Sequence, residues 1–309
     1  MTQRTALHHD CLHCLVFVRH DGARKTDETI VTFLLSLMPS IWPWLVLISA
    51  QLAALARRTG IAFSLLVLFI SIASAIGLMS PTAIAAVVFG LVGAALLPHL
   101  KGWPAIAGHL LLILWCLVMG AHLLPGFNNL KILDQVQAGA GSASFTMHLN
   151  LDKPMVFFAI LLAWPRMQRG KTQIKPTAVL VGLLILPGLF LIGFSLGSVQ
   201  PEFTVPPWWL VFALSNAFLT CLTEEAFFRG YLQSAFAVRL GDAWSVITAS
   251  LLFGLAHFAG GPALVAFASI LGLACGLGYY ATSRLWVPVA MHFGFNLTHL
   301  FLFTYPGPL

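Results

Sequence analysis

Two adjacent glutamates within an apolar stretch are the residues of this sequence best suited to chemistry. Glu224 and Glu225 lie in a long hydrophobic segment that runs from Trp208 towards Leu240, whereas the other eight of the ten acidic residues lie in loops or tails. A charge near the centre of a bilayer costs roughly 2.5 to 3.5 kcal/mol on insertion scales, and such groups are generally retained for function. The alternative is an ion pair that only holds two helices together. We expect a functional site.

Helical spacing separates the roles of the two carboxylates. Arg229 follows Glu225 by four residues, so the two side chains share a helix face and can form an ion pair. Glu224 is rotated by about 100° from Glu225 and shares its face with Thr220 and Asn216. We therefore predict that Glu225 is the orienting carboxylate, supported by Arg229. Glu224 is predicted to remain free to meet a partner from another helix.

A histidine on the next apolar run is the predicted partner of Glu224. Gly241 and Asp242 form the turn between the two helices, and Glu224 lies 17 residues before Gly241, while His257 lies 16 residues after it. At a rise of about 1.5 Å per residue, an antiparallel helical hairpin places both side chains at nearly the same depth. A lone histidine in a core is usually only hydrogen-bonded. A histidine level with an unpaired glutamate indicates a catalytic pair.

The last apolar run adds two polar side chains on one face. His292 and Asn296 are four residues apart, and His299 continues the same stripe. Imidazole and carboxamide donors at this spacing can both stabilise one developing oxyanion. The alternative is hydrogen bonding between packed membrane helices. Beside Glu224 and His257, we expect the oxyanion role.

Other small or sulfur-containing residues in the apolar runs are interpreted as packing features. A small residue at every fourth position lets two helices approach closely, and buried thiols usually fill a core. These positions are Ala268, Gly272 and Gly276 for the small stripe, and Cys116, Cys221 and Cys275 for the thiols.

The elements that position the polar residues are transmembrane helices. The chain has 309 residues, of which 59% are hydrophobic and 8% charged, whereas a soluble domain has roughly 25% charged residues. Its apolar runs are long and continuous rather than alternating, which excludes a β-barrel. The basic residues behind the net charge of +6 are scattered between these runs, which indicates control of membrane topology rather than nucleic-acid binding. We predict an all-α, polytopic transmembrane bundle of about 8–10 spans.

The apolar runs predict the membrane spans, and the segments between them predict the surface parts of the chain. The longest segment between runs is Pro125–Pro154, in which alternating apolar residues from Phe145 to Leu151 predict a short extended piece at the membrane surface. A polar tail over residues 1–29 is expected to be disordered. The expected spans are Ile30–Ala56, Ile61–Met79, Thr82–Leu97, Ala105–Leu124, Thr177–Val199, Trp208–Thr223, Trp244–Phe258, Ala263–Thr282 and Trp286–Phe303, with a shorter run at Met155–Trp164.

Charged loops predict the orientation. The loop 166–175 has four basic residues and no acid, whereas 200–207 has Glu202 and no base, so the positive-inside rule places 166–175 in the cytoplasm. The same count places the basic N-terminal tail outside, which conflicts with the rule. The conflict disappears if residues 1–37 are not translated, or if the run 155–164 does not span. Both alternatives stay open.

Three motifs, in order and on separate predicted helices, resemble one protease family. Residues 224–229 fit EExxxR, 253–257 fit FxxxH and 292–296 fit HxxxN, with NLDKP at 150–154 as a weaker upstream match. They resemble the CPBP family of intramembrane glutamic endopeptidases. This family contains the CAAX prenyl endopeptidases and the bacteriocin-processing and self-immunity proteins, also called the abortive-infection family. The resemblance divides the chain into the tail, N-terminal transmembrane helices with a surface loop over 30–149, and a catalytic membrane domain over 150–303.

The resemblance implies an activity and roles for the site residues. Glu224 and His257 would activate a water molecule, and His292 and Asn296 would stabilise the oxyanion. Glu225 and Arg229 would support them. The implied enzyme is a cofactor-free, CAAX-protease-like endopeptidase of the bacterial inner membrane. It would act on a membrane-associated protein or peptide, which the sequence does not identify.

Two other functions of the polar residues, a zinc protease and a transporter, stay open as alternatives. Glu224, His257 and His292 form a chemically plausible zinc set, although the chain lacks an HExxH helix. Intramembrane Glu and His also build transporters and proton relays, although the sequence has no inverted repeat. A CxxC at Cys11 and Cys14 beside three histidines has no second ligand pair, so an incidental tail is preferred over a metal site.

Overall fold

The computed structural model describes residues 30–168 and 173–309, and these residues are mostly helical. The predictions for the tail, for Cys11 and Cys14, and for Arg169 and Lys171 lie outside the described residues. The elements in chain order are α1 (Ile30–Leu55), α2 (Thr59–Ala75), α3 (Pro81–Leu96), η1 (Leu97–His99), α4 (Trp103–Gly120), β1 (Leu130–Val136), β2 (Phe145–Leu149), α5 (Met155–Ala163), η2 (Pro165–Gln168), α6 (Pro176–Ser195), α7 (Trp209–Leu214), η3 (Ser215–Cys221), α8 (Leu222–Glu225), η4 (Ala226–Gln233), α9 (Ser234–Leu255), η5 (Phe258–Gly260), α10 (Gly261–Thr282) and α11 (Trp286–Leu302).

The predicted class, a helical membrane bundle, is confirmed. Five helices of the described chain are long and apolar enough to cross a bilayer, and two shorter apolar helices accompany them. The longest of the five, Trp209–Leu255, is broken at Gly241, where φ is +75° and ψ is 172°, so it consists of two helical segments joined by a turn. The predicted 8–10 spans exceed this count because several apolar runs form short helices. The five are Pro81–His99, Trp103–Gly120, Pro176–Ser195, Trp209–Leu255 and Phe258–Thr282.

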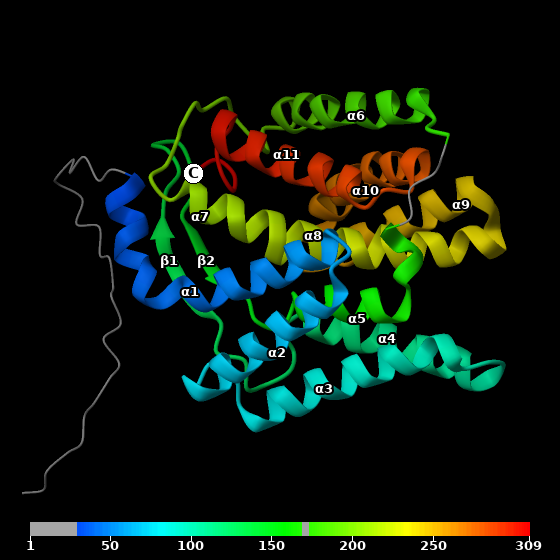
Figure 1. Ribbon diagram of the computed structural model, residues 1–309. Helices are drawn as coiled ribbons and strands as arrows, with labels where there is room; N and C mark the ends of the chain where they lie inside the picture. The colour runs from blue at the N-terminus through cyan, green and yellow to red at the C-terminus, as the bar shows by residue number, and fades with distance from the viewer. Residues whose placement is uncertain (1–29, 169–172) are drawn as a thin grey trace, which may run out of the picture.

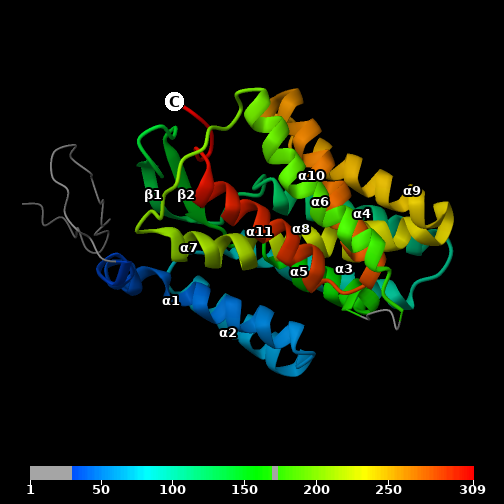
Figure 2. The same cartoon turned by 90° about the horizontal axis from the view of Figure 1, so that it is seen from above.

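The helices run lengthwise between two different ends (Figures 1 and 2). At the hairpin end lie the β1–β2 hairpin and the C-terminal residues, and Phe33 near the start of α1 packs there with Trp208 and Met147. At the turn end lie Gly241, η2 and the start of α6 (Figure 1). There Lys175 Nζ is 3.9 Å from an Asp242 carboxylate oxygen, and the Lys175 backbone N–H bonds to the end of α10. Arg166 and Lys175, the described basic residues of the segment 166–175, thus lie at the turn end.

The extended piece predicted around Phe145 is one strand of an antiparallel hairpin. β2 pairs with β1 through Leu130↔Leu149 and Val136↔Phe145, with irregularities between these pairs. Sequence alternation did not reveal β1. The connection is fixed by Glu202, whose carboxylate accepts hydrogen bonds from the Gly141 N–H at 2.7 Å and from the Ser142 hydroxyl.

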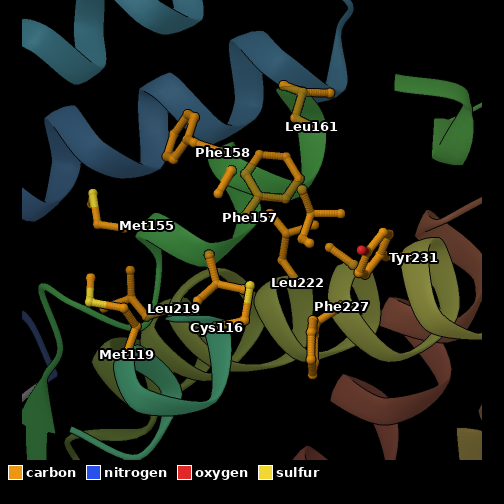
Figure 3. Packing of buried hydrophobic residues seen from close by; sticks show 14 of the residues in the cluster. Cys116, Met119, Met155, Phe157, Phe158, Leu161, Leu219, Leu222, Phe227 and Tyr231 are labelled. Atoms are coloured by element: carbon orange, nitrogen blue, oxygen red, sulfur yellow. The ribbon is translucent and has the colours of Figure 1, made fainter. Parts of the chain in front are cut away.

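Helix α5 is short, and all of its residues except the partly buried Leu162 are buried in the protein. Its nine residues span about 13.5 Å, against roughly 30 Å for the hydrocarbon core. Figure 3 shows Phe157 and Phe158 surrounded by side chains from other elements, including Leu222. After α5, the Met167 carbonyl accepts a hydrogen bond from Tyr279 near the turn end. Residues 150–154 and α5 together therefore carry the chain from the hairpin end to the turn end. α5 is not among the described helices long enough to cross a bilayer, which agrees with the alternative in which this run does not span.

Candidate active site

The two glutamates lie on one helical turn between two π-helical segments. α7, η3, α8, η4 and the first part of α9 form a continuous helix, with η3 before and η4 after the α8 turn. π-Helical segments are rare and are frequent at functional sites. One of their carbonyls, that of Phe218, accepts a hydrogen bond from the buried Gln51 of α1 at 3.1 Å. This helix is therefore anchored to its neighbours by polar contacts as well as by packing.

The predicted ion pair between Glu225 and Arg229 is present. Arg229 Nε is 3.2 Å from Glu225 Oε2, and Arg229 Nη1 donates to Oε1 at 3.2 Å. Both side chains are fully buried. The guanidinium also donates to the Gly272 carbonyl at 3.0 Å. Because an unpaired buried charge is strongly destabilising, these contacts allow both groups to remain in the core.

The small-residue stripe of α10 provides the surface that receives this helix. Gly272 and Gly276 offer their carbonyls to Arg229 and Gln233, which are themselves four residues apart. A Cβ on Gly272 would lie 3.1 Å from Arg229 Nη2 and 3.2 Å from the Ser250 backbone. The stripe is thus a packing feature, as the sequence indicates, and it also supplies hydrogen-bond acceptors.

His292 is attached to the same carboxylate. Its Nδ1 lies 2.8 Å from Glu225 Oε1, so Glu225 accepts from residues of two different motifs. Since a carboxylate oxygen accepts, Nδ1 donates, and Nε2 is the ring nitrogen left for another partner. The orienting role predicted for Glu225 therefore extends to His292.

Phe253 brings the three motifs into contact. Its buried ring has the Arg229 guanidinium 4.4 Å from its centroid, and the ring centroids of His257 and His292 lie 4.8 Å and 5.6 Å away. Phe253 also packs edge-on against Phe228 at 5.1 Å, across the Gly241 turn. This contact shows the antiparallel register that was inferred by counting residues from Gly241.

His257 is held with one ring nitrogen free. Its Nδ1 lies 2.8 Å from the Phe253 carbonyl oxygen, which can only accept, so Nδ1 carries the hydrogen. In the neutral ring, Nε2 then presents a lone pair. The half-buried His257 also interacts electrostatically with Glu224. That Glu224 and His257 hold one water between them stays a prediction.

Glu224, which was predicted to meet a partner from another helix, also pairs with a lysine from the segment before α5. Its Oε1 lies 2.5 Å from Lys153 Nζ, and the two side chains are 14% and 16% exposed. Spacing within one helix cannot reveal a partner from a loop 71 residues away. The NLDKP motif at 150–154 contains this lysine, but Lys153 was assigned no role at the site from the sequence.

Hydrogen bonds hold the NLDKP segment in place on the N-terminal side of Lys153. Asp152 accepts from His122 Nδ1 at 2.7 Å and from the Lys153 N–H at 2.9 Å. Trp44 of α1 donates to the Asn150 carbonyl at 3.1 Å, and Asn129 accepts from the Leu151 N–H at 2.8 Å. These contacts fix the position of the Lys153 side chain beside Glu224.

Asn296 belongs to a second polar cluster, which includes a thiol. Asn296 donates to Asn216 Oδ1 at 3.1 Å, and the Cys221 thiol donates to the same oxygen at 3.2 Å. Cys221 is buried, as expected for a packing residue. It lies three residues before Glu224, and its hydrogen bond to Asn216 makes it part of this polar cluster. His299 lies elsewhere: its Nε2 bonds to the Thr304 carbonyl at 3.1 Å.

The zinc set is not assembled in the described part of the chain. Among residues 30–168 and 173–309, no three His, Cys, Asp or Glu side chains are grouped as metal ligands. Lys153 occupies one oxygen of Glu224, and Glu225 occupies Nδ1 of His292. Neither contact blocks the other Glu224 oxygen or His292 Nε2, because a metal-bound histidine commonly donates its other ring N–H to a carboxylate.

Comparison with known families gives one match. Residues 206–298 match a family described as type II CAAX prenyl endopeptidase Rce1-like. The matched range extends from just before α7 into α11 and contains all three motifs, whereas Lys153 lies outside it. No curated protein and no solved structure matches the chain.

Proposed function

We propose that this multi-pass membrane protein, whose residues 206–298 match the family described as type II CAAX prenyl endopeptidase Rce1-like, is an intramembrane endopeptidase in which Glu224 and His257 activate water. The family is one of membrane proteases, which implies membrane-associated substrates. The observation that carries the proposal is the convergence at Phe253 and Glu225. Side chains from the EExxxR, FxxxH and HxxxN segments all meet there.

The proposed reaction is hydrolysis of a peptide bond. A water between the Glu224 carboxylate and His257 Nε2 loses a proton to Glu224 and attacks the carbonyl carbon. His292, doubly protonated as an imidazolium, donates from Nε2 to the resulting oxyanion, and the Asn296 amide donates to it as well. The carbonyl then re-forms, the C–N bond breaks, and the proton passes from Glu224 to the leaving amine. Lys153 holds Glu224 as a carboxylate, which is the form that a general base requires.

The direct test compares cells that carry the wild-type chain with cells that carry Glu224→Gln. Membrane proteins are isolated from both and their termini are identified by mass spectrometry. New termini that depend on Glu224 support the peptidase. Identical termini, together with Glu224-dependent movement of protons or a solute into proteoliposomes, would instead support a transporter.

Metal dependence separates the water mechanism proposed here from zinc catalysis. We expect activity to survive chelation and the purified protein to hold far less than one zinc per chain. His292→Ala should still bind substrate but lose about 10²–10³ in rate, because it removes only an oxyanion donor. Elemental analysis and turnover with and without chelator provide the measurement. Stoichiometric zinc that is lost in the His257 and His292 variants, with activity restored by added zinc, would overturn this mechanism.

Lys153 gives a second functional prediction. Replacing Lys153 by methionine should lower turnover by about 10²-fold. The ion pair positions the Glu224 carboxylate, and a displacement of a catalytic group by roughly 1 Å can reduce the rate by that factor. Lys153→Arg should restore a large part of it. Lys101→Met, at an exposed loop between α3 and α4, is the matched control. Unchanged turnover in Lys153→Met would show that the ion pair with Glu224 has no part in the reaction.

A further inference from the structure

A cleft of about 740 Å³ opens at the hairpin end, and the proposed mechanism does not use it. One wall is β2 and the segment that follows it, and the facing wall is the helix formed by α7 and η3. Its lining includes Thr146 and His148 from β2, and Ser215, Asn216 and Thr220 from the helix. Figure 1 shows β2 beside the start of α7.

The cleft runs along an edge of β2 rather than over one face. Four consecutive residues, 145–148, line it, although side chains of a strand alternate between the two faces. β1 pairs with the other edge, through Lys131↔His148 and Leu133↔Met147. In the described chain, the sheet has only these two strands, so the edge of β2 facing the cleft has no strand partner. Such an edge offers backbone N–H and C=O groups to an added strand.

The lining suits an uncharged peptide. It contains amide and hydroxyl side chains but no Asp, Glu, Lys or Arg. Of its two histidines, His122 binds Asp152. Partial loss of hydration and the nearby Lys131 lower the pKa of His148, which favours its neutral form. Tyr305 packs edge-on against Phe145 and Phe212 and gives one part of the cleft an aromatic wall. Amides can bond to a peptide backbone, and the aromatic wall can take an apolar side chain.

The cleft leads to the candidate active site. Asn216 in its lining accepts a hydrogen bond from Asn296, and Thr220 lies four residues before Glu224. On the opposite wall, Asn150 lies three residues before Lys153. An extended peptide spans about 3.3 Å per residue, so a few residues along β2 reach from the cleft to the depth of Glu224.

We propose that this cleft binds the substrate, as an extended, uncharged peptide segment that adds as a third strand to the free edge of β2 and presents its scissile bond to Glu224. The inference rests on the proposed peptidase function and names its substrate class. Because Arg166 and Lys175 lie at the opposite end, which the positive-inside rule assigns to the cytoplasm, the peptide enters from the non-cytoplasmic side.

The test measures binding separately from turnover. The full-length Glu224→Gln protein carries a photo-crosslinking phenylalanine derivative at His148, which lies in β2 and is exposed. A matched protein carries it at Trp103, which is 81% exposed at the start of α4. The probe is a biotinylated peptide of alternating serine and valine, and the comparison probe is the same peptide with every backbone nitrogen methylated.

We expect labelling at position 148 but not at 103, in spheroplasts but not in inverted membrane vesicles. Labelling by the methylated peptide should be at least about tenfold weaker, because this peptide cannot donate backbone hydrogen bonds. Equal labelling at both positions, equal labelling by both peptides, or labelling only in inverted vesicles would overturn the inference. Peptide cleavage by wild type tests the proposed function independently: cleavage without labelling at 148 refutes only the cleft, and Glu224-independent termini refute only the peptidase.

Discussion

Replacing Glu224 by glutamine is expected to lower turnover at least ~10²-fold while the protein still accumulates in the membrane, because glutamine keeps the shape of the side chain but cannot act as a base. The measurement is turnover per inserted protein. The change leaves the Lys153 charge without its carboxylate, so part of any loss could come from that cation.

A double variant, Lys153→Met with Glu224→Gln, resolves this point. It removes the cation and the base together, so it should accumulate like wild type and remain inactive. If Glu224→Gln retained full activity, the catalytic assignment would fail. If the double variant recovered activity, Glu224 would serve only to neutralise Lys153.

The second large effect concerns the stability of the protein. Glu225→Gln and Arg229→Gln should each destabilise it by ~3–5 kcal/mol, since each leaves a fully buried charge unpaired. Both single variants should accumulate poorly, as measured by quantitative immunoblotting of membranes, and the double variant should recover part of the loss. Normal accumulation of both singles, with only turnover reduced, would show that the pair is not structural.

Glu225 and Arg229 should also differ from one another. Glu225 binds His292 Nδ1 as well as Arg229, whereas Arg229 reaches the Gly272 carbonyl. The protein that does accumulate should therefore be less active per molecule in Glu225→Gln than in Arg229→Gln. This comparison separates the support of His292 from the support of the fold.

Local periodicity predicted the parts of the site that depend on one helix or one hairpin. The spacing of Glu225 and Arg229 fixes a shared face wherever the chain is helical. Counting from Gly241 predicted the antiparallel register, because helical rise is constant and the glycine supplies the positive φ that the turn requires. The Phe228–Phe253 contact is the result.

Long-range contacts were beyond what spacing can predict. Lys153 reaches Glu224 from an extended segment whose path depends on Trp44 and Asn129, far away in sequence. Cys221 was classed by composition alone, although its neighbours in space are polar. β1 was not predicted from the sequence. Its register with β2 shifts twice, so its apolar residues do not alternate regularly with polar ones.

The short helix α5 has a consequence for how the protein is made. Nine apolar residues preceded by Asp152 and Lys153 are too few to leave the insertion machinery as an independent span. Their only apolar surroundings are other parts of the chain, and those include Leu222 and Phe227, which are synthesised later. Residues 150–163 must therefore wait at the membrane boundary until the helix that carries Glu224 has been inserted. Lys153 and Glu224, each costly to bury alone, then enter the bundle together as a neutral pair.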